Sequence, residues 1–208
     1  MQLGYFWSTQ GETQHINAEY TRGNDYTVNG HQSSNGFFGL GYYVDALDKD
    51  RFALSYGLNG FFLPKTGVGG DIIQESTFTN LNYWYSIQHI PVYLAAKAIL
   101  KNNNPKYNIT LDGGLGPNFM RTSAYNETAL NDYTIPANNF SPHNSVTFSA
   151  TASIGVRLNN VFGKAPLECN YRFFYLGPGQ LSINNDLLLN TLKTGNNFAN
   201  AVICSLTV

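Results

Sequence analysis

The side chains that could bind a metal ion are few and widely spaced in this sequence. Zinc sites in proteins need cysteine and histidine ligands at short, characteristic spacings. No cysteine or histidine pair here has such a spacing, and the four histidines are scattered: His15, His31, His89 and His143. We therefore expect no metal centre and no cofactor, and we interpret the histidines as exposed loop or interfacial residues.

A second candidate for chemistry is the glycine-rich stretch KTGVGGD at 65–71, which contains Gly67, Gly69 and Gly70. Glycine-rich loops cradle phosphates when they open a helix and carry a GK[ST] sequence. Neither that sequence nor a helical periodicity follows here. The stretch is therefore predicted to be a flexible loop.

The composition limits the kind of protein to which these residues belong. The 208 residues include 12 Lys and Arg against 13 Asp and Glu, so no basic surface for nucleic acid is expected. Only 12% of the residues are charged and 14% are aromatic, a balance that favours β-structure over helix. No apolar run is long enough for a transmembrane helix, and no secretory signal opens the chain. We expect the mature part of an exported protein.

The stretch SVTFSATASIGVRL at 145–158 alternates apolar and polar residues without a break. A period of two over that length predicts a β-strand with two chemically different faces. The same kind of pattern predicts eight strands in all, at 2–9, 36–47, 51–63, 79–100, 107–121, 145–158, 166–176 and 198–208.

The connections between these strands alternate in length. Three are short, at 48–50, 101–106 and 159–165, and four are long, at about 10–35, 64–78, 122–144 and 177–197. All long loops then lie at one end of an up-and-down sheet, and both termini lie at the other. This layout is typical of an all-β, eight-stranded antiparallel transmembrane β-barrel with short periplasmic turns and long extracellular loops. No linker divides the chain, so residues 1–208 are expected to form one domain.

The strand predicted at 79–100 changes its apolar parity at Pro91. Odd positions such as Tyr83 and Tyr85 are apolar before the proline, whereas even positions such as Val92 and Leu94 are apolar after it. One inserted residue reverses every side chain beyond it, so we predict a β-bulge at Pro91.

The two faces of the predicted strands differ in volume. One parity carries bulky Phe, Leu, Tyr, Ile and Val, and the other carries small or polar residues with a few charges. Side chains just fill an eight-stranded barrel, so we expect the small parity inside and the bulky parity against lipid. A soluble lipocalin-like barrel, the alternative, would need charges on the outward parity. Counting from the turns pairs the inward charges as Arg157 with Glu168, Lys97 with Asp112, and Asp45 with Arg51, with Arg172 one layer above Glu168.

Cys169 and Cys204 lie on neighbouring predicted strands at similar depth, on the parity that faces lipid. Two interpretations stay open for them. They form a cross-strand disulfide if the geometry permits it, or they are two small apolar residues in contact with lipid.

Three stretches of the chain carry a resemblance to a known family: IPVYLAAKAIL (90–100), LDGGLGPNF (111–119) and FANAVICSLTV (198–208). They resemble the small eight-stranded outer-membrane β-barrel proteins of Gram-negative bacteria, in the OmpA/OmpX-like group. The resemblance covers essentially the whole chain and implies a bacterial outer-membrane location. Members of the group usually end in an aromatic residue, whereas this chain ends in Val208.

Some barrels of this group are enzymes that act on lipid A, and the resemblance brings two candidate sites. For the deacylase type, the resemblance implies a His-x-Ser pair on a strand that faces lipid. His143 and Ser145 have this spacing, but by parity both side chains point inward. The palmitoyltransferase type uses His, Asp and Ser in extracellular loops, and the first long loop contains Asp25, His31, Ser33 and Ser34. Such residues are ordinary in polar loops, so no enzyme is expected.

The sequence therefore predicts a monomeric, non-catalytic barrel that anchors its loops at the cell surface, because binding residues usually lie on loops. The expected partners are outer-membrane lipid and lipopolysaccharide, with host or envelope surface components as candidates for the loops. A lipid A-modifying enzyme and a narrow pore are the alternative functions. The third long loop is the most apolar and is the predicted contact surface, through Tyr125, Tyr133, Ile135 and Phe140. The alternative for these residues is that the loop packs on itself over the mouth of the barrel.

Overall fold

All eight segments of alternating polarity form strands in the structure, a computed structural model that describes residues 1–102, 106–162 and 165–206. The predicted turns at 101–106 and 159–165 lie partly outside these residues. Among the described residues, no helix is long and apolar enough to cross a membrane. The eight long strands are β1 (Gln2–Thr9), β5 (Ser34–Asp48), β6 (Phe52–Gln74), β7 (Phe78–Lys101), β8 (Tyr107–Ala129), β10 (His143–Phe162), β11 (Ala165–Gln180) and β13 (Lys193–Leu206).

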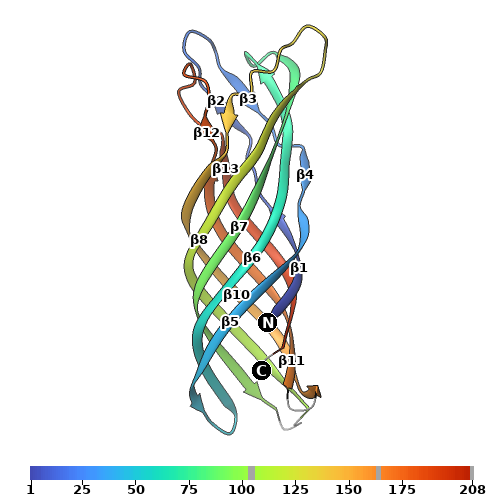
Figure 1. Cartoon of the computed structure of the whole chain (residues 1–208), viewed down its shortest axis with the longest axis vertical. Helices are drawn as coiled ribbons and strands as arrows, with labels where there is room; N and C mark the ends of the chain where they lie inside the picture. The colour runs from blue at the N-terminus through green and yellow to red at the C-terminus, as the bar shows by residue number, and fades with distance from the viewer. Residues whose placement is uncertain (103–105, 163–164, 207–208) are drawn as a thin grey trace.

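The long strands pair into a ring. Their order around the sheet is β6, β5, β1, β13, β11, β10, β8 and β7, and β7 pairs again with β6. Every pairing in this ring is antiparallel. Figure 1 shows the strands tilted around a long cylinder, with the extended loops at the upper end and both termini in the lower half. The predicted eight-stranded up-and-down barrel is confirmed.

Five short strands lie in the connections between the long strands. Figure 1 shows β2, β3 and β12 near the upper end and β4 lower, along the side of the barrel. The first long connection contains β2 (Gln14–Ile16), β3 (Asn24–Tyr26) and β4 (Gly30–Gln32). Both β3 and β4 pair with β6, so this loop continues the sheet above the point where β5 leaves it. The other two short strands, β9 (Phe140–Ser141) and β12 (Ser182–Ile183), pair with each other.

The long strands extend well past their predicted upper ends. The region predicted as a loop at 64–78 is strand except for a turn at 75–77, because β6 continues to Gln74 and β7 begins at Phe78. The predicted loops at 122–144 and 177–197 are shortened in the same way by β8, β11 and β13. In this upper region the inward side chains are apolar, as at Tyr83 and Ile87. The alternation therefore continues with its sense reversed, both within the predicted strand 79–100 and within the predicted loop 64–78, where Val68 and Ile72 are buried.

The glycine-rich stretch is part of strand β6 and is not a flexible loop, which corrects the prediction. A Cβ atom on Gly67 would lie 1.9 Å from the ring of Trp84, and one on Gly69 would lie 2.5 Å from the same ring. A Cβ atom on Gly70 would lie 1.6 Å from the carbonyl oxygen of Thr27. These glycines allow the Trp84 ring and the first loop to lie directly against the backbone of β6.

Pro91 does not mark a bulge, so that prediction is wrong. It pairs in regular register with Asn118, and odd residues on both sides of it, such as Tyr85 and Tyr93, are buried inside the barrel. The apparent change of parity arises because the interior changes from apolar to small and polar side chains along β7. The register shifts between β7 and its two neighbours lie elsewhere. Those with β6 lie between Leu63 and Thr66 and between Ile72 and Ile73, and the one with β8 lies beside Ala124, where φ is 54°.

The bulky parity faces outward, as predicted. Large apolar side chains from all eight strands are exposed around the lower part of the barrel, which is the arrangement that a lipid bilayer requires and that water does not favour. Representative members are Leu3, Leu40, Tyr42, Leu58, Leu94, Leu115, Val146, Ile154, Tyr171 and Val202.

Buried side chains fill the interior in three successive layers. A charged layer nearest the turns contains Lys97 and Arg172. An aromatic layer follows, made mainly of Phe6, Phe37, Phe61, Tyr93 and Phe174. An upper apolar core lies beneath the loops and combines strand and loop residues, among them Ile16, Tyr26, Val68, Ile72, Leu81, Tyr83, Tyr85, Ile87, Met120, Phe140, Leu181 and Leu192.

Candidate functional site

The charged layer is built around a buried ion pair between Asp112 on β8 and Arg172 on β11. The guanidinium Nη2 donates to Asp112 Oδ2 at 2.7 Å, and no more than 2% of either side chain is exposed. On the strand between them, the Ser153 hydroxyl donates to the same oxygen at 2.5 Å, and Thr151 Oγ1 accepts from Nη1 at 3.2 Å. The charge of Arg172 is thus compensated in a place that water does not reach.

A second pair, Lys97 on β7 and Glu168 on β11, spans the lumen. The ammonium group donates to both carboxylate oxygens, at 2.9 and 3.1 Å. Asn170 donates to Glu168 Oε1 at 2.9 Å, and the ammonium lies 4.9 Å from the ring centre of Tyr43. These contacts connect opposite walls of the barrel.

The predicted charge pairs have the right register and the wrong partners. Arg157 lies opposite Glu168, and Lys97 opposite Asp112, as predicted. The carboxylates nevertheless bind Lys97 and Arg172, and Arg157 forms no ion pair within the described residues. Counting residues from a turn identifies only the residues that lie opposite each other on two adjacent strands. In a narrow closed ring, long side chains reach partners on strands that are not adjacent.

The predicted pair of Asp45 and Arg51 is also corrected. Asp45 lies opposite Ser55, whose hydroxyl donates to Asp45 Oδ1 at 2.9 Å. Arg51 lies in the turn between β5 and β6 and is exposed. In the part of the chain that the structure describes, these two side chains form no ion pair.

Cys169 on β11 and Cys204 on β13 are joined by a disulfide. They lie directly opposite each other in the ladder, with their Cα atoms 4.1 Å apart. Of the two interpretations that the sequence leaves open, the structure therefore has the cross-strand bond.

The upper end of the barrel is closed by a structured cap, which we define as the loop residues 10–33, 130–142 and 181–192. A buried carboxylate, Glu127 at the top of β8, positions the middle segment. It accepts hydrogen bonds from the backbone N–H groups of Ala137, Asn138 and Asn139 at 3.0, 3.0 and 3.1 Å. The Tyr125 hydroxyl donates to it at 2.5 Å. Sequence analysis missed Glu127. It has an odd number, which is the outward parity along the lower part of β8, and it faces inward only beyond the register shift beside Ala124. The alternation of residue types therefore gave no signal for it.

Hydrogen bonds join the three segments of the cap to one another. Between the segments 130–142 and 181–192, β9 pairs with β12, and the N–H group of Asn184 donates to the Asn139 carbonyl at 2.9 Å. Between the segments 10–33 and 181–192, the N–H group of Glu19 donates to the Leu187 carbonyl at 2.8 Å, and that of Leu189 to the Asn17 carbonyl at 2.9 Å. The loops therefore form one folded surface.

The predicted contact residues of the third loop divide into two groups. Tyr125 and Phe140 are packed in the upper apolar core, with their rings 5.4 Å apart, and do not form part of an exposed surface. Tyr133 and Ile135 protrude into solvent, with 97% and 87% of each residue exposed. Only the second pair is placed where it can touch a partner.

The candidate catalytic residues are not assembled as the resemblance implies. The His143 imidazole lies 2.8 Å from the Ser182 hydroxyl on the cap, and the hydrogen bonds of the described residues do not join it to Ser145. Its side chain belongs to the inward parity, as predicted. In the first loop, Ser34 accepts from the Tyr5 hydroxyl at 2.8 Å, and the Ser33 carbonyl accepts from the backbone N–H group of Ser8.

Asp25 of the first loop binds residues that sequence analysis did not group with it. His15 Nδ1 lies 2.6 Å from Asp25 Oδ1, and the Ser76 hydroxyl donates to Oδ2 at 2.7 Å. The hydrogen bond with His15, with help from Ser76, holds the pKa of the Asp25 carboxyl below its usual range. The serine contacts the carboxylate and not the imidazole, so this trio lacks the order of a nucleophile, base and acid.

The histidines also differ in their surroundings. His89, expected to be exposed or interfacial, is buried inside the barrel, where its Nδ1 lies 2.9 Å from the amide nitrogen of Asn118. His15 and His31 are exposed in the first loop. Among the described residues, no group of three or more His, Cys, Asp or Glu side chains is arranged to hold a metal ion.

The decisive observation for the class of protein is the combination of a closed antiparallel ring, a filled interior and an apolar outer belt. The chain is an outer-membrane type β-barrel. Barrels with these properties cross membranes with strands, their short turns on one side and their longer loops on the other. The expected outer-membrane location follows from this architecture.

Comparisons with known proteins found no matching family model and no matching curated protein. Among solved structures, the outer membrane protein OprG from Pseudomonas aeruginosa is similar, with 14% identity, 99% of this chain and 91% of that chain covered, and a TM-score of 0.47. The outer membrane protein AlkL has 10% identity, 99% and 89% coverage and a TM-score of 0.44. The attachment invasion locus protein Ail of Yersinia pestis has 12% identity, 98% and 95% coverage and a TM-score of 0.34.

Proposed function

We propose that the protein is a sealed, non-catalytic anchor that presents the cap to a partner outside the membrane. The observation that carries this proposal is the cap itself, in which three loops far apart in the sequence are joined by backbone hydrogen bonds. Ordering loops costs conformational entropy, and a rigid surface binds a partner with less further ordering. The cap therefore has the property that a recognition surface needs.

The filled interior favours an anchor over a pore. Lys97 binds a carboxylate across the lumen, Arg172 binds another along the wall, and an aromatic layer and the upper apolar core lie above them. A barrel of eight strands is just wide enough for such side chains. The pairing of His143 with Ser182, in place of Ser145, supports a role without catalysis.

The exposed apolar side chains of the segment 130–142 are the proposed contact point. The side chains of Tyr133 and Ile135 are exposed to solvent. Two residues after Ile135, the backbone N–H group of Ala137 donates to Glu127, which holds the segment in place. Aromatic and aliphatic residues held rigidly at a protruding tip are typical anchors of protein interfaces. The partner is a host or envelope surface component that these side chains touch.

The double substitution Tyr133→Ser and Ile135→Ser is expected to reduce attachment by about tenfold, the effect of losing one anchor of ~1.4 kcal/mol. The measurement is attachment of bacteria displaying the protein to host-cell monolayers, compared with bacteria that lack it. The matched control is Leu187→Ser with Leu189→Ser, which removes two exposed apolar side chains from another segment of the cap.

Gel mobility before and after boiling establishes that each variant is folded and present. Full attachment of the Tyr133 and Ile135 variant would contradict the proposed contact point. If bacteria that display the unmodified protein attach no better than bacteria without it, the proposed function as a whole is contradicted.

A further inference from the structure

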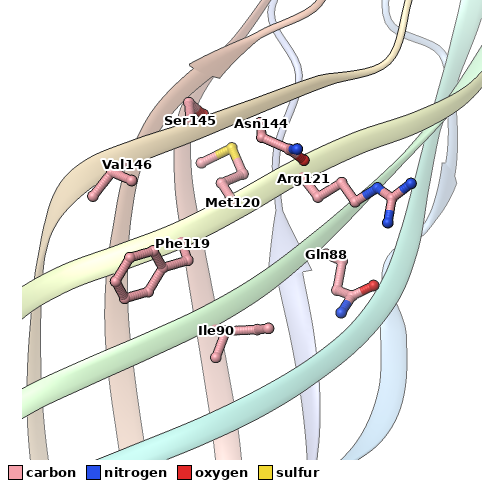
Figure 2. A pocket seen from close by; sticks show the side chains of 8 residues that line it. All are labelled: Gln88, Ile90, Phe119, Met120, Arg121, Asn144, Ser145 and Val146. Carbon is pink, nitrogen blue, oxygen red and sulfur yellow. The ribbon is translucent and has the colours of Figure 1, made fainter.

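A groove of about 360 Å³ lies on the barrel wall, across β7, β8 and β10 and below the cap. It is separate from the cap and from the lumen network described above. Figure 2 shows its side chains in two groups, with Arg121, Gln88 and Asn144 on one side and Phe119, Ile90 and Val146 on the other. Met120 and Ser145 complete the lining.

The two groups are adjacent rows of the β-ladder. Ile90 pairs with Phe119 and Phe119 with Val146, which makes one apolar row across three strands. The neighbouring row toward the cap is polar, since Gln88 pairs with Arg121 and Arg121 with Asn144. The outward residue thus changes from apolar to polar at the same step on all three strands.

This step marks the outer boundary of the membrane on this side of the barrel. The apolar row continues the exposed belt formed by Leu94, Leu115 and Phe148 further down the same strands. A lipid that lies against the belt has its acyl chains beside the apolar row. Its headgroup then lies at the level of the polar row.

Arg121 is the cation at this boundary, and its charge is uncompensated by the protein. Its side chain is exposed, and it takes part in none of the ion pairs or hydrogen bonds within the described residues. A guanidinium offers several donors in a planar fork that matches phosphate geometry. The amides of Gln88 and Asn144 in the same row supply further donors.

We propose that this groove binds one phosphate-bearing lipid of the surrounding outer leaflet. Its phosphate accepts hydrogen bonds from Arg121, with Gln88 and Asn144 beside it, and an acyl chain lies along Ile90, Phe119 and Val146. The apolar half of the groove is what selects a lipid over free phosphate, because a free anion would leave that half unused. The site belongs to the wall of the barrel and does not depend on the function proposed for the cap.

The test is native mass spectrometry of the whole protein folded in micelles of an uncharged detergent. The probes are lipid A with both phosphates, the same lipid A after dephosphorylation, and inorganic phosphate. We expect one bound molecule of phosphorylated lipid A, and binding about tenfold weaker for the dephosphorylated form, since hydrogen bonds to charged groups contribute on the order of this factor.

Arg121→Gln is expected to weaken binding of phosphorylated lipid A by about tenfold and to leave the dephosphorylated form unchanged. Phe119→Ser should weaken the binding of both forms of lipid A, because it removes part of the apolar row. The control Arg51→Gln removes an exposed arginine at the opposite end of the barrel and should bind as the unmodified protein does. Since Arg121 points outward and has no partner in the protein, its replacement is expected to leave gel mobility unchanged.

Three outcomes would overturn the proposal. One is undiminished binding by the Arg121→Gln variant, and another is an equal loss with Arg51→Gln. The third is binding of inorganic phosphate through Arg121 with no preference for the lipid, which would assign the site to a free anion.

Discussion

Replacing Asp112 by leucine is expected to lower the free energy of unfolding by about 3–5 kcal/mol. The substitution leaves the Arg172 guanidinium buried in the lumen without its counter-ion, and a buried charge that loses its partner is strongly destabilising. Arg172→Met should have a similar effect, because it leaves the Asp112 carboxylate buried without its counter-ion. Urea unfolding of the barrel in phospholipid vesicles, followed by the loss of the fast-migrating gel band, measures both.

The double variant Asp112→Leu with Arg172→Met is expected to be more stable than either single variant. Removing both charges together leaves neither uncompensated, and apolar replacement of a buried pair is often neutral. Asp48→Leu is the matched control, since Asp48 pairs with Lys101 at an exposed site and its loss should cost no more than about 1 kcal/mol. Destabilisation of the double variant by the sum of the two single effects would contradict the account of this pair.

Replacing Glu127 by alanine is expected to release residues 130–142 from the cap while the barrel stays folded. Three backbone N–H groups, those of residues 137–139, then lose their acceptor. The Asn139 donor is buried and the other two are partly buried. Because an unsatisfied buried donor costs about 1–3 kcal/mol, losing the shared acceptor of all three is expected to release this segment. Hydrogen exchange of these amides is expected to accelerate at least a hundredfold.

The control for this variant is Glu75→Ala. Glu75 accepts one backbone N–H bond, from Arg22, in an exposed turn, and its removal should leave the exchange of residues 130–142 unchanged. Protection of those amides in the Glu127→Ala variant equal to that in the unmodified protein would show that the carboxylate does not hold the segment. Loss of the barrel's own strand signals would show instead that Glu127 is needed for the whole fold.

The alternation of residue types was sufficient to predict the eight strands, their order and the face that each presents to lipid. The reason is that a strand with a period of two exposes every second side chain, and lipid and lumen demand different volumes. The register of two ladders also followed from turn positions, since Lys97 lies opposite Asp112 and Arg157 opposite Glu168. The first hairpin did not follow, because a register shift places Asp45 opposite Ser55.

The contacts inside the ring could not be predicted in the same way. Arg172 and Asp112 lie in one ladder row, on either side of Ser153, on strands separated by β10. Their approach depends on the curvature of the barrel wall, which the pairing of adjacent strands does not give. The same limit explains Tyr83 and Tyr85, whose apolar character suggested lipid although they pack beneath the cap. Above the membrane the outside becomes polar and the inside apolar, so one rule for the whole strand misplaces them and produces a false bulge at Pro91.

The most direct test of the central claim is a measurement of which side chains touch lipid. In nanodiscs, cross-relaxation in NMR from lipid acyl chains to methyl groups is expected for Leu94 and Val146, which are 68% and 65% exposed on the outer face. It is expected to be absent for Leu63 and Ile203, which are 0% and 2% exposed inside the barrel. Acyl contacts at Leu63 and Ile203, with none at Leu94 and Val146, would contradict the assignment of inside and outside on which the sealed anchor depends.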